Sequence, residues 1–167
     1  MRRLPYRCLL ASNDAWTSTF RWRSRVARYR EVPWNDSHPK MFSSWHRLAP
    51  ESQYWSPRLL HSLWKPKEIY ITENECAASD VVAADGQVYE SDRLMYLRNA
   101  MMWNQRATSE GIPLKGNFYW SAMENFEWTY GFGTRFGLVH VDFKTQKRTP
   151  KMSALWFREA ARRNAVA

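Results

Sequence analysis

The sequence predicts an α/β fold with a parallel sheet, because apolar strand-like runs alternate with amphipathic helix-like segments. The expected order is a strand at 68–72, a helix at 91–110, a strand at 114–121 and a final helix at 151–163. Both strand runs are apolar almost throughout, which is typical of strands buried on both faces. A strand–helix–strand unit of this kind is expected to place its strands side by side and parallel, with a right-handed crossover.

A loop and then a helix are expected before the first strand. The segment 32–50 holds three prolines around an Asn-Asp-Ser run, which is a loop composition. Pro50 suits a helix start, and Pro57 marks a kink or a second start within the helix. The apolar positions of this helix are Tyr54, Leu59, Leu60 and Leu63, and Lys-Pro-Lys at 65–67 ends it.

The later elements follow from caps and periodicity. Residues 74–90 form a long loop with an Asp-Gly turn signal, and Ser-Asp at 91–92 caps a helix that Gly111 stops. The run 136–143 alternates and predicts a third strand with one exposed side. The final helix is expected to turn these side chains inward: Ala154, Leu155, Phe157 and Ala161.

The aromatic content, 16% of residues with ten tryptophans, has two interpretations. Tryptophan and tyrosine fill large cores. Alternatively, flat rings line a sugar site, where the C–H faces of a sugar stack on them. Composition alone favours the core. The sequence has no run of 18 or more apolar residues, so we expect no membrane span.

The net charge of +9 would suggest nucleic acid as a partner, but its distribution argues against that. Residues 1–30 hold eight arginines and one acidic residue, so this segment carries seven of the nine net charges. We expect 1–30 to be a basic tail of uncertain structure. Its composition, poor in acidic residues, also fits an organellar transit peptide.

The two cysteines, Cys8 and Cys76, are far apart and lack the spacing of a zinc site or a disulfide framework. Free thiols in a reducing compartment are the default interpretation, which favours a cytoplasmic location. We expect no metal and no cofactor.

Three polar motifs follow the expected strands. Ile-Thr-Glu-Asn at 71–74 ends the first strand, and Trp-Ser-Ala-Met-Glu-Asn-Phe-Glu-Trp at 120–128 follows the second. Arg-Phe-Gly-Leu at 135–138 comes next, followed by Val-Asp at 141–142. Because the carboxyl ends of parallel strands form the active face of such folds, Glu73 and Glu127 are expected on one rim among tryptophans.

These motifs resemble those of glycoside hydrolase family 1. The family carries Ile/Val-Thr-Glu-Asn-Gly on the seventh strand of a (β/α)8 barrel and Trp-Ser-Leu-x-Asp-Asn-Phe-Glu-Trp after the eighth. It then carries Gly-Tyr-x-x-Arg-Phe-Gly, where this chain has Gly-Phe-Gly-Thr-Arg-Phe-Gly at 131–137. The similarity covers 31–167 and is strongest from 68 to 157. It implies a partial (β/α)8 TIM barrel at 31–167, with the last two barrel strands and their helices, since a whole barrel takes about 250 residues.

The resemblance assigns roles to matching positions. Glu73 matches the nucleophile that attacks the anomeric carbon in a retaining mechanism. Glu127 matches the acceptor for the glycone 4- and 6-hydroxyls, and Trp120 matches the ring beneath the glycone. Trp128 matches a donor to the 3-hydroxyl, and Phe136 matches a wall of the pocket. The plainer alternatives are a helix cap for Glu73 and a core role for the two tryptophans.

Several positions depart from the family pattern. Glu75 stands in place of a glycine, which would strain the backbone at a positive φ and place a negative charge near Glu73, raising its pKa. Asn117 replaces an aromatic residue, and Ala122 replaces a leucine. Glu124 replaces an aspartate, a mild change.

The chain contains no Asn-Glu-Pro, the tripeptide that supplies the family's acid/base carboxylate. The resemblance as a whole implies a β-glucosidase of carbohydrate metabolism that acts on terminal β-D-glucosyl residues. Because the acid/base tripeptide is missing, this chain is expected to be a fragment of such an enzyme, weakly active or inactive. Its partners would be β-glucosides or oligosaccharides, and further copies of itself through exposed barrel edges. A non-catalytic sugar-binding remnant remains an alternative, and a basic protein that binds nucleic acid or a membrane surface is a weaker one.

Overall fold

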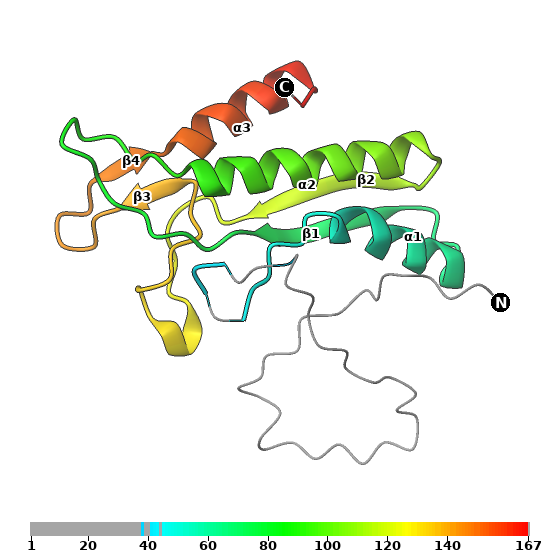
Figure 1. The fold of residues 1–167 in the computed structure, drawn as a ribbon, viewed down its shortest axis with the longest axis horizontal. Coiled ribbons are helices and arrows are strands. Elements are labelled where there is room, and N and C mark those ends of the chain that lie inside the picture. Colours follow the sequence, from blue (N-terminus) through cyan, green and yellow to red (C-terminus); the bar gives the residue numbers. More distant parts are fainter. Residues whose placement is uncertain (1–37, 39–40, 44, 167) are drawn as a thin grey trace, which may run out of the picture.

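The computed structural model describes residues 38, 41–43 and 45–166, so the basic segment 1–30 lies outside the described residues. The chain forms three α-helices, four strands and one short 3-10 helix in this part (Figure 1). In chain order the elements are α1 (Ser52–Trp64), β1 (Ile69–Glu75), α2 (Ser91–Ser109), β2 (Leu114–Trp120), η1 (Trp128–Tyr130), β3 (Val139–Val141), β4 (Arg148–Pro150) and α3 (Met152–Arg163).

Strands β1 and β2 form the expected parallel pair, with α2 as the connection between them. Ile69 pairs with Leu114 at the start, and Glu75 pairs with Trp120 at the end. The register shifts twice along the pair, the second time between Ile71 and Asn74. The two carboxyl ends therefore meet at one edge of the sheet, as the order of the elements predicted.

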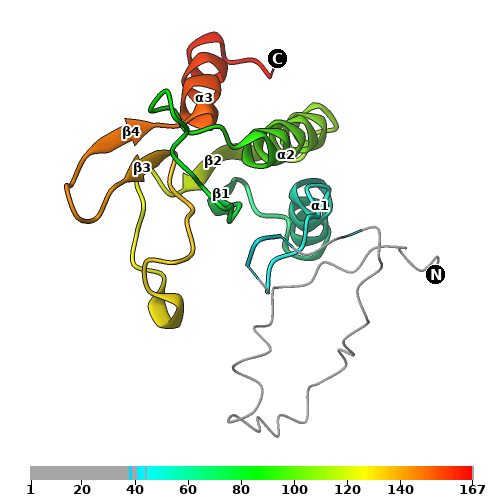
Figure 2. The same cartoon turned by 60° about the vertical axis from the view of Figure 1, so that its left-hand side comes forward.

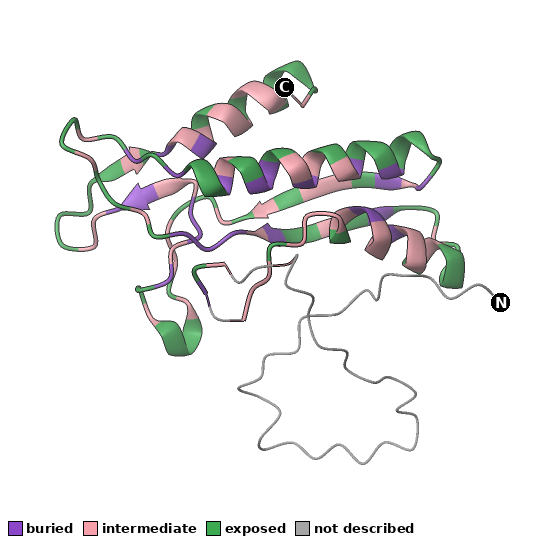
Figure 3. Ribbon diagram, viewed as in Figure 1, coloured by how far each residue is buried: buried purple, intermediate pink, exposed green. Residues whose placement is uncertain are grey.

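Helices α1 and α2 cover one face of this two-stranded sheet (Figure 2). The main core cluster lies between them and contains Tyr54, Ile69, Ala107, Ile112 and Leu114. A second cluster near the carboxyl end of β1 contains Cys76, Tyr96 and Ala100. The buried positions of α2 accordingly run along the side that faces the strands (Figure 3).

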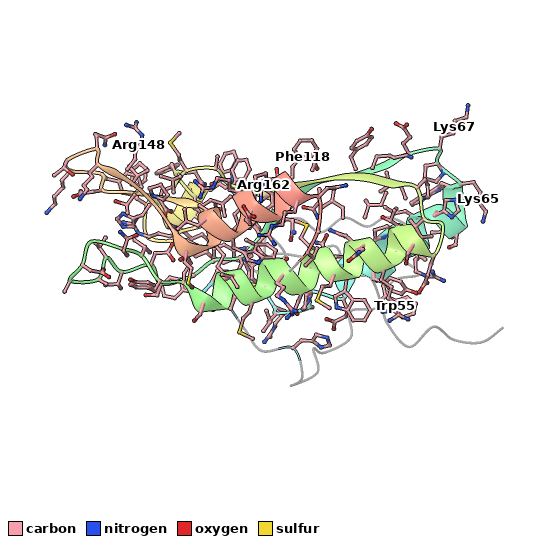
Figure 4. All side chains as sticks on the ribbon, turned by 90° about the horizontal axis from the view of Figure 1, so that it is seen from above. Trp55, Lys65, Lys67, Phe118, Arg148 and Arg162 are labelled. Carbon is pink, nitrogen blue, oxygen red and sulfur yellow. The ribbon has the colours of Figure 1, made fainter. Side chains whose placement is uncertain are left out.

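The opposite face of the sheet is open in the described part of the chain. Tyr70 on β1 is 52% exposed and Phe118 on β2 is 60% exposed. Phe118 projects from β2 on the side away from α2 (Figure 4). The expectation of strands buried on both faces is therefore wrong for this structure, because the helices cover only one face.

Helix α1 runs without interruption through Pro57, which is buried, and it ends at Lys65 in the left-handed conformation. Helix α2 ends before Gly111, whose φ of +86° favours glycine and explains the stop. Both helices confirm the sequence-based assignments to within two residues. None of the helices in the described residues is long and apolar enough to cross a membrane.

The expected third strand at 136–143 is mostly wrong. Only Val139–Val141 is extended, and it pairs antiparallel with β4 in a separate hairpin that the sequence analysis did not predict. The hairpin turn is built by Asp142, whose carboxylate accepts the backbone N–H groups of Lys144 and Thr145. The β3–β4 pairing begins only at Val139, because Gly137 lies against the backbone of the loop after β2.

Helix α3 is correctly placed, but its expected inward face is only partly right. The Phe157 ring lies 6.5 Å from the ring of Tyr119, so this side chain does face the sheet. Leu155 is 46% exposed and Ala161 is also exposed. The reason is geometric, since α3 packs on α2 at its beginning and then extends away from it (Figure 1).

Candidate functional site

Glu73 lies near the carboxyl end of β1 and is exposed. Its carboxylate makes no hydrogen bond or ion pair with the residues that the structure describes. The strand brings it to the same edge of the sheet as Trp120, the last residue of β2. The site thus begins with an open carboxylate at the junction of two strand ends.

A polar network lies behind Glu73. The amide of Asn74 accepts a hydrogen bond from the Tyr96 hydroxyl at 2.7 Å and donates one to Asn117 at 3.3 Å. Gln53 on α1 closes the network by accepting from Asn117 at 3.2 Å and donating to Asn74 at 3.5 Å. Asn117, a departure from the family pattern, is therefore satisfied by Gln53, and the network fixes the strand segment that carries Glu73.

Glu75 is also accommodated. It is not among the residues with positive φ, so the backbone cost that a replaced glycine would carry does not arise. Its carboxylate lies 2.7 Å from Nε2 of His46, and Nδ1 of the same ring lies 2.7 Å from the Ser43 hydroxyl. The Glu75 carboxylate is therefore turned toward His46 and has a partner of its own.

The loop after β2 places Glu127. The Trp120–Ser121 peptide bond is cis, and the chain turns there into the loop. Asn125 donates from Nδ2 to Oε2 of Glu127 at 3.1 Å, and its own Oδ1 lies 3.2 Å from the Ser121 hydroxyl. The Glu127 carboxylate is therefore oriented from within its own loop and stays half-buried.

Two tryptophans, one at the end of β2 and one after it, are exposed to solvent. Trp120 is 37% exposed, and Trp128 at the start of η1 is 82% exposed. The neighbouring Tyr130 ring lies 4.1 Å from the ring of Trp45, which ties the loop before α1 to η1. A core role for Trp128 is excluded within the described structure.

Phe136 is fully buried, with 0% of its surface exposed. Its ring meets the edge of His46 at 5.7 Å, and its backbone carbonyl accepts the Tyr119 hydroxyl at 2.9 Å. It therefore lies beneath the site and offers no surface to a ligand in this structure.

Cys76 follows Glu75 directly and is a free, buried thiol. Burial raises its pKa to about 12, so it stays protonated and unreactive at neutral pH. Cys8 lies outside the described residues. No group of histidine, cysteine or acidic side chains in the described part of the chain is arranged to hold a metal ion.

Four residues that no sequence pattern predicted support this edge: Ser43, Trp45, His46 and Gln53. All of them precede β1, in a stretch that we interpreted only as a loop and the start of a helix. The one signal that could have found His46 is Glu75 itself, because a carboxylate in the place of a glycine needs a partner.

These features define the class: a portion of an α/β barrel whose strand edge carries carboxylates and exposed tryptophans. The profile described as "Glycosyl hydrolase family 1" matches residues 6–166. The chain belongs to this family. The match also extends the similarity beyond the range 31–167 given by the motifs, into most of the basic segment.

The relatives are β-glucosidases by name. The chain is 41% identical over 128 residues to "Beta-glucosidase A" of Thermotoga maritima, covering 77% of this chain and 28% of that protein. It is 33% identical over 152 residues to the "Bifunctional beta-D-glucosidase/beta-D-fucosidase" of Bifidobacterium breve, covering 89% of this chain and 30% of that protein. The chain therefore spans less than a third of the length of these relatives.

The solved structures agree. The family 1 β-glucosidase from Thermotoga maritima in complex with isofagomine lactam superposes with a TM-score of 0.75 at 41% identity, covering 78% of this chain and 29% of that one. A complex of the Thermotoga maritima β-glucosidase with glucoimidazole gives the same TM-score at 40% identity, covering 80% and 30%. The fold is thus the C-terminal portion of a (β/α)8 barrel, with its last two strands and their helices.

Proposed function

We propose that this chain supplies the nucleophile and part of the glycone pocket of a retaining β-glucosidase. The observation that carries the proposal is the parallel pairing of β1 and β2, with Glu75 opposite Trp120. This pairing brings the two family motifs to the same edge of the sheet. The family and the printed names of its relatives support the substrate class, a terminal β-D-glucosyl residue.

The proposed roles follow from the motif positions. Glu73 attacks the anomeric carbon, forming a bond from its carboxylate oxygen to that carbon as the glycosidic bond breaks. The carboxylate of Glu127, held by Asn125, accepts hydrogen bonds from glycone hydroxyls, and Trp120 lies beneath the sugar ring. Trp128 donates its indole N–H, which its high exposure leaves available. Because Phe136 is buried, we propose that it supports the pocket from behind.

A leaving-group acid has no counterpart among the motifs of this sequence. Retaining hydrolysis requires a second carboxylic acid about 5 Å from the nucleophile to protonate the departing oxygen. The proposed contribution of these residues is therefore nucleophilic attack and glycone binding, with protonation of the leaving group outside their chemistry.

Covalent labelling tests this proposal. The full chain is incubated with a fluorinated glucoside that carries a good leaving group, and digested peptides are weighed by mass spectrometry. A reactive site gives a glycosyl adduct on the peptide that contains Glu73, absent in Glu73→Gln. Glu68→Gln is a matched control, because Glu68 is another exposed carboxylate and lies just before β1.

A second readout separates catalysis from simple sugar binding. Glucoimidazole is titrated calorimetrically into the chain and into Glu127→Gln and Trp120→Ala. Binding that both substitutions weaken, without any adduct on Glu73, would favour the non-catalytic sugar-binding alternative. If the chain neither binds glucoimidazole nor forms an adduct on Glu73, both functions are refuted for this chain.

A further inference from the structure

Four charged side chains are buried together beneath the loops that follow β1 and β2. None of them is more than 1% exposed. They come from four separate segments: Asp80 from the loop after β1, Arg93 from α2, Glu124 from the loop after β2, and Lys151 from the residue before α3. We call these four residues the buried ion cluster.

One half of the cluster is complete without Lys151. Arg93 donates to both carboxylate oxygens of Asp80, at 3.0 and 2.9 Å. Its Nε also donates to the backbone carbonyl of Cys76 at 3.2 Å, and its Nη2 donates to that of Arg135 at 2.9 Å. Nη1 lies 3.6 Å from the carboxylate of Glu90, a neighbouring buried side chain outside the four. A bidentate pair of this geometry is among the strongest contacts a buried guanidinium makes.

The other half depends on Lys151. Its ammonium contacts the carboxylate of Asp80 and lies 2.5 Å from Oε1 of Glu124. The next cation to Glu124 is Arg135, at 3.8 Å, and neither oxygen of Glu124 has an aligned hydrogen-bond donor in the described structure. Burial lowers the pKa of Lys151, and Arg93 adds to this, whereas the two carboxylates oppose it. Lys151 is therefore the main counter-charge of Glu124.

The two loops that Lys151 joins are the ones that carry the candidate site. Asp80 lies in the loop that leaves β1 just after Glu73. Glu124 directly precedes Asn125, which orients Glu127. The Lys151 backbone is itself fixed, because its N–H donates to the Leu138 carbonyl at 3.0 Å. One ammonium thus bridges both loops from a fixed point.

We propose that Lys151 is a positioning residue, which sets the placement of the loop 121–131 relative to the end of β1. The link to glycone binding rests on the proposed function, whereas the link to loop placement does not. Glu124 stands where the family pattern has an aspartate, and its carboxylate contacts the ammonium directly.

Two measurements on the full chain test this: hydrogen exchange of the 121–131 peptide, and calorimetric binding of glucoimidazole. Lys151→Met keeps the length of the side chain and removes its charge. We expect exchange of this peptide to rise, and glucoimidazole affinity to fall, about ten-fold each, the size of coupling that packed networks transmit. The peptide from α1 should keep its exchange rate.

Two further variants separate positioning from a general loss of stability. Ala107→Gly, at a fully buried position in the main core, lowers stability without touching the buried ion cluster. In this variant, hydrogen exchange of the 121–131 peptide should rise no more than that of the other peptides. The double variant Glu124→Gln/Lys151→Met removes the unpaired carboxylate, so its melting temperature should recover while the loop still exchanges fast. It also replaces Lys151→Met in both measurements should that variant not fold.

Recovery of exchange protection together with melting temperature in the double variant would overturn the proposal and leave Lys151 a structural counter-ion. An unchanged 121–131 peptide in Lys151→Met would overturn it as well. Failure of the parent chain to bind glucoimidazole would count against the proposed function alone, because the exchange measurement still decides the role of Lys151.

Discussion

Single residues at this strand edge show how a departure from a family pattern is absorbed. Glu75 and Asn117 both stand where the resemblance places other residue types, and both have partners that precede β1 in sequence. His46 pairs with Glu75, and Gln53 pairs with Asn117. Each polar group therefore has a partner and avoids the desolvation cost of an unsatisfied polar group.

Gly137 shows the opposite case, a position where no side chain is tolerated. A Cβ atom there would lie 2.4 Å from the backbone nitrogen of Glu124 and 2.5 Å from the carbonyl carbon of Met123. We predict that Gly137→Ala destabilises the chain by about 1–3 kcal/mol, since backbone atoms must shift to make room. Thermal unfolding followed by circular dichroism measures the loss.

Gly133→Ala is the matched control for that substitution. Its nearest neighbour would be the Tyr130 carbonyl oxygen at 3.5 Å, an ordinary contact. Equal melting temperatures for the two variants would show that the loop after β2 does not lie against residue 137.

Among the elements, a polar contact joins the first half of α1 to the C-terminal end of α2, in addition to the core between the two helices. The Tyr54 hydroxyl donates to Glu110 at 2.5 Å, and the same carboxylate accepts from Arg58 at 2.6 Å and from Arg106 at 3.0 Å. The hydrogen bond to Glu110 and burial raise the pKa of Tyr54, so the phenol remains a donor.

We predict that Tyr54→Phe costs about 0.5–1.5 kcal/mol, because it removes this hydrogen bond and keeps the buried ring. Chemical denaturation gives the free energy of unfolding. Tyr70→Phe, which removes an exposed hydroxyl bonded to Glu68 at 3.2 Å, should change stability far less. If Tyr70→Phe lowered the free energy of unfolding as much as Tyr54→Phe, the buried hydrogen bond of Tyr54 would not be the cause of the loss.

The elements also show what the sequence could predict. Local signals located α1, α2 and the parallel pair, because Gly111 and the apolar runs depend on neighbouring residues alone. The cap expected from Ser-Asp at 91–92 is wrong, since Glu90 is the N-cap of α2 and no side chain caps it. The β3–β4 hairpin was missed because β3 and β4 are three-residue strands, and the turn depends on the Asp142 side chain. Burial was the weakest prediction: Leu155 and Phe118 are apolar, and only the arrangement of whole elements decides which faces are covered.

The same contrast holds at the site. The motifs predicted the strand edge that carries Glu73 and Trp120, because their order along the chain fixes which strand ends meet. The supporting pairs at His46 and Lys151 were not predictable, since each joins segments that are distant in sequence. The catalytic and binding roles of Glu73, Trp120, Glu127, Trp128 and Phe136 remain predictions.

At the scale of the whole molecule, the open face of β1 and β2 is the main unsatisfied surface in the described residues. Its exposed rings, Tyr70 and Phe118, lie beside strand edges that have no partner in the described part of the chain. Exposed apolar faces and free strand edges both promote association. We therefore expect the chain to self-associate through this face.

Sedimentation velocity over a range of concentrations measures this association. Phe118→Lys places a charge on the open face and should shift the chain toward the monomer. Trp64→Lys is the control, because Trp64 is even more exposed but lies at the end of α1. A monomeric parent chain at all concentrations, with a cooperative melt, would contradict the expectation.

Catalysis depends on the whole site, so the rate of hydrolysis by this chain should depend on how much protonation the leaving group of the substrate needs. The proposed site includes no general acid, so a contribution of about 10²–10⁴-fold in rate should be absent for leaving groups that need protonation. We predict no useful turnover of cellobiose. An activated aryl glucoside, whose leaving group departs with little protonation, is the substrate on which any reactivity of Glu73 should appear, and Glu73→Gln should abolish it. Release of the aryl group is followed by absorbance, and glucose from cellobiose by a coupled assay. Robust hydrolysis of cellobiose by the purified chain would require an acid among its own residues, and the first to substitute would then be Glu127, the carboxylate in the loop after β2.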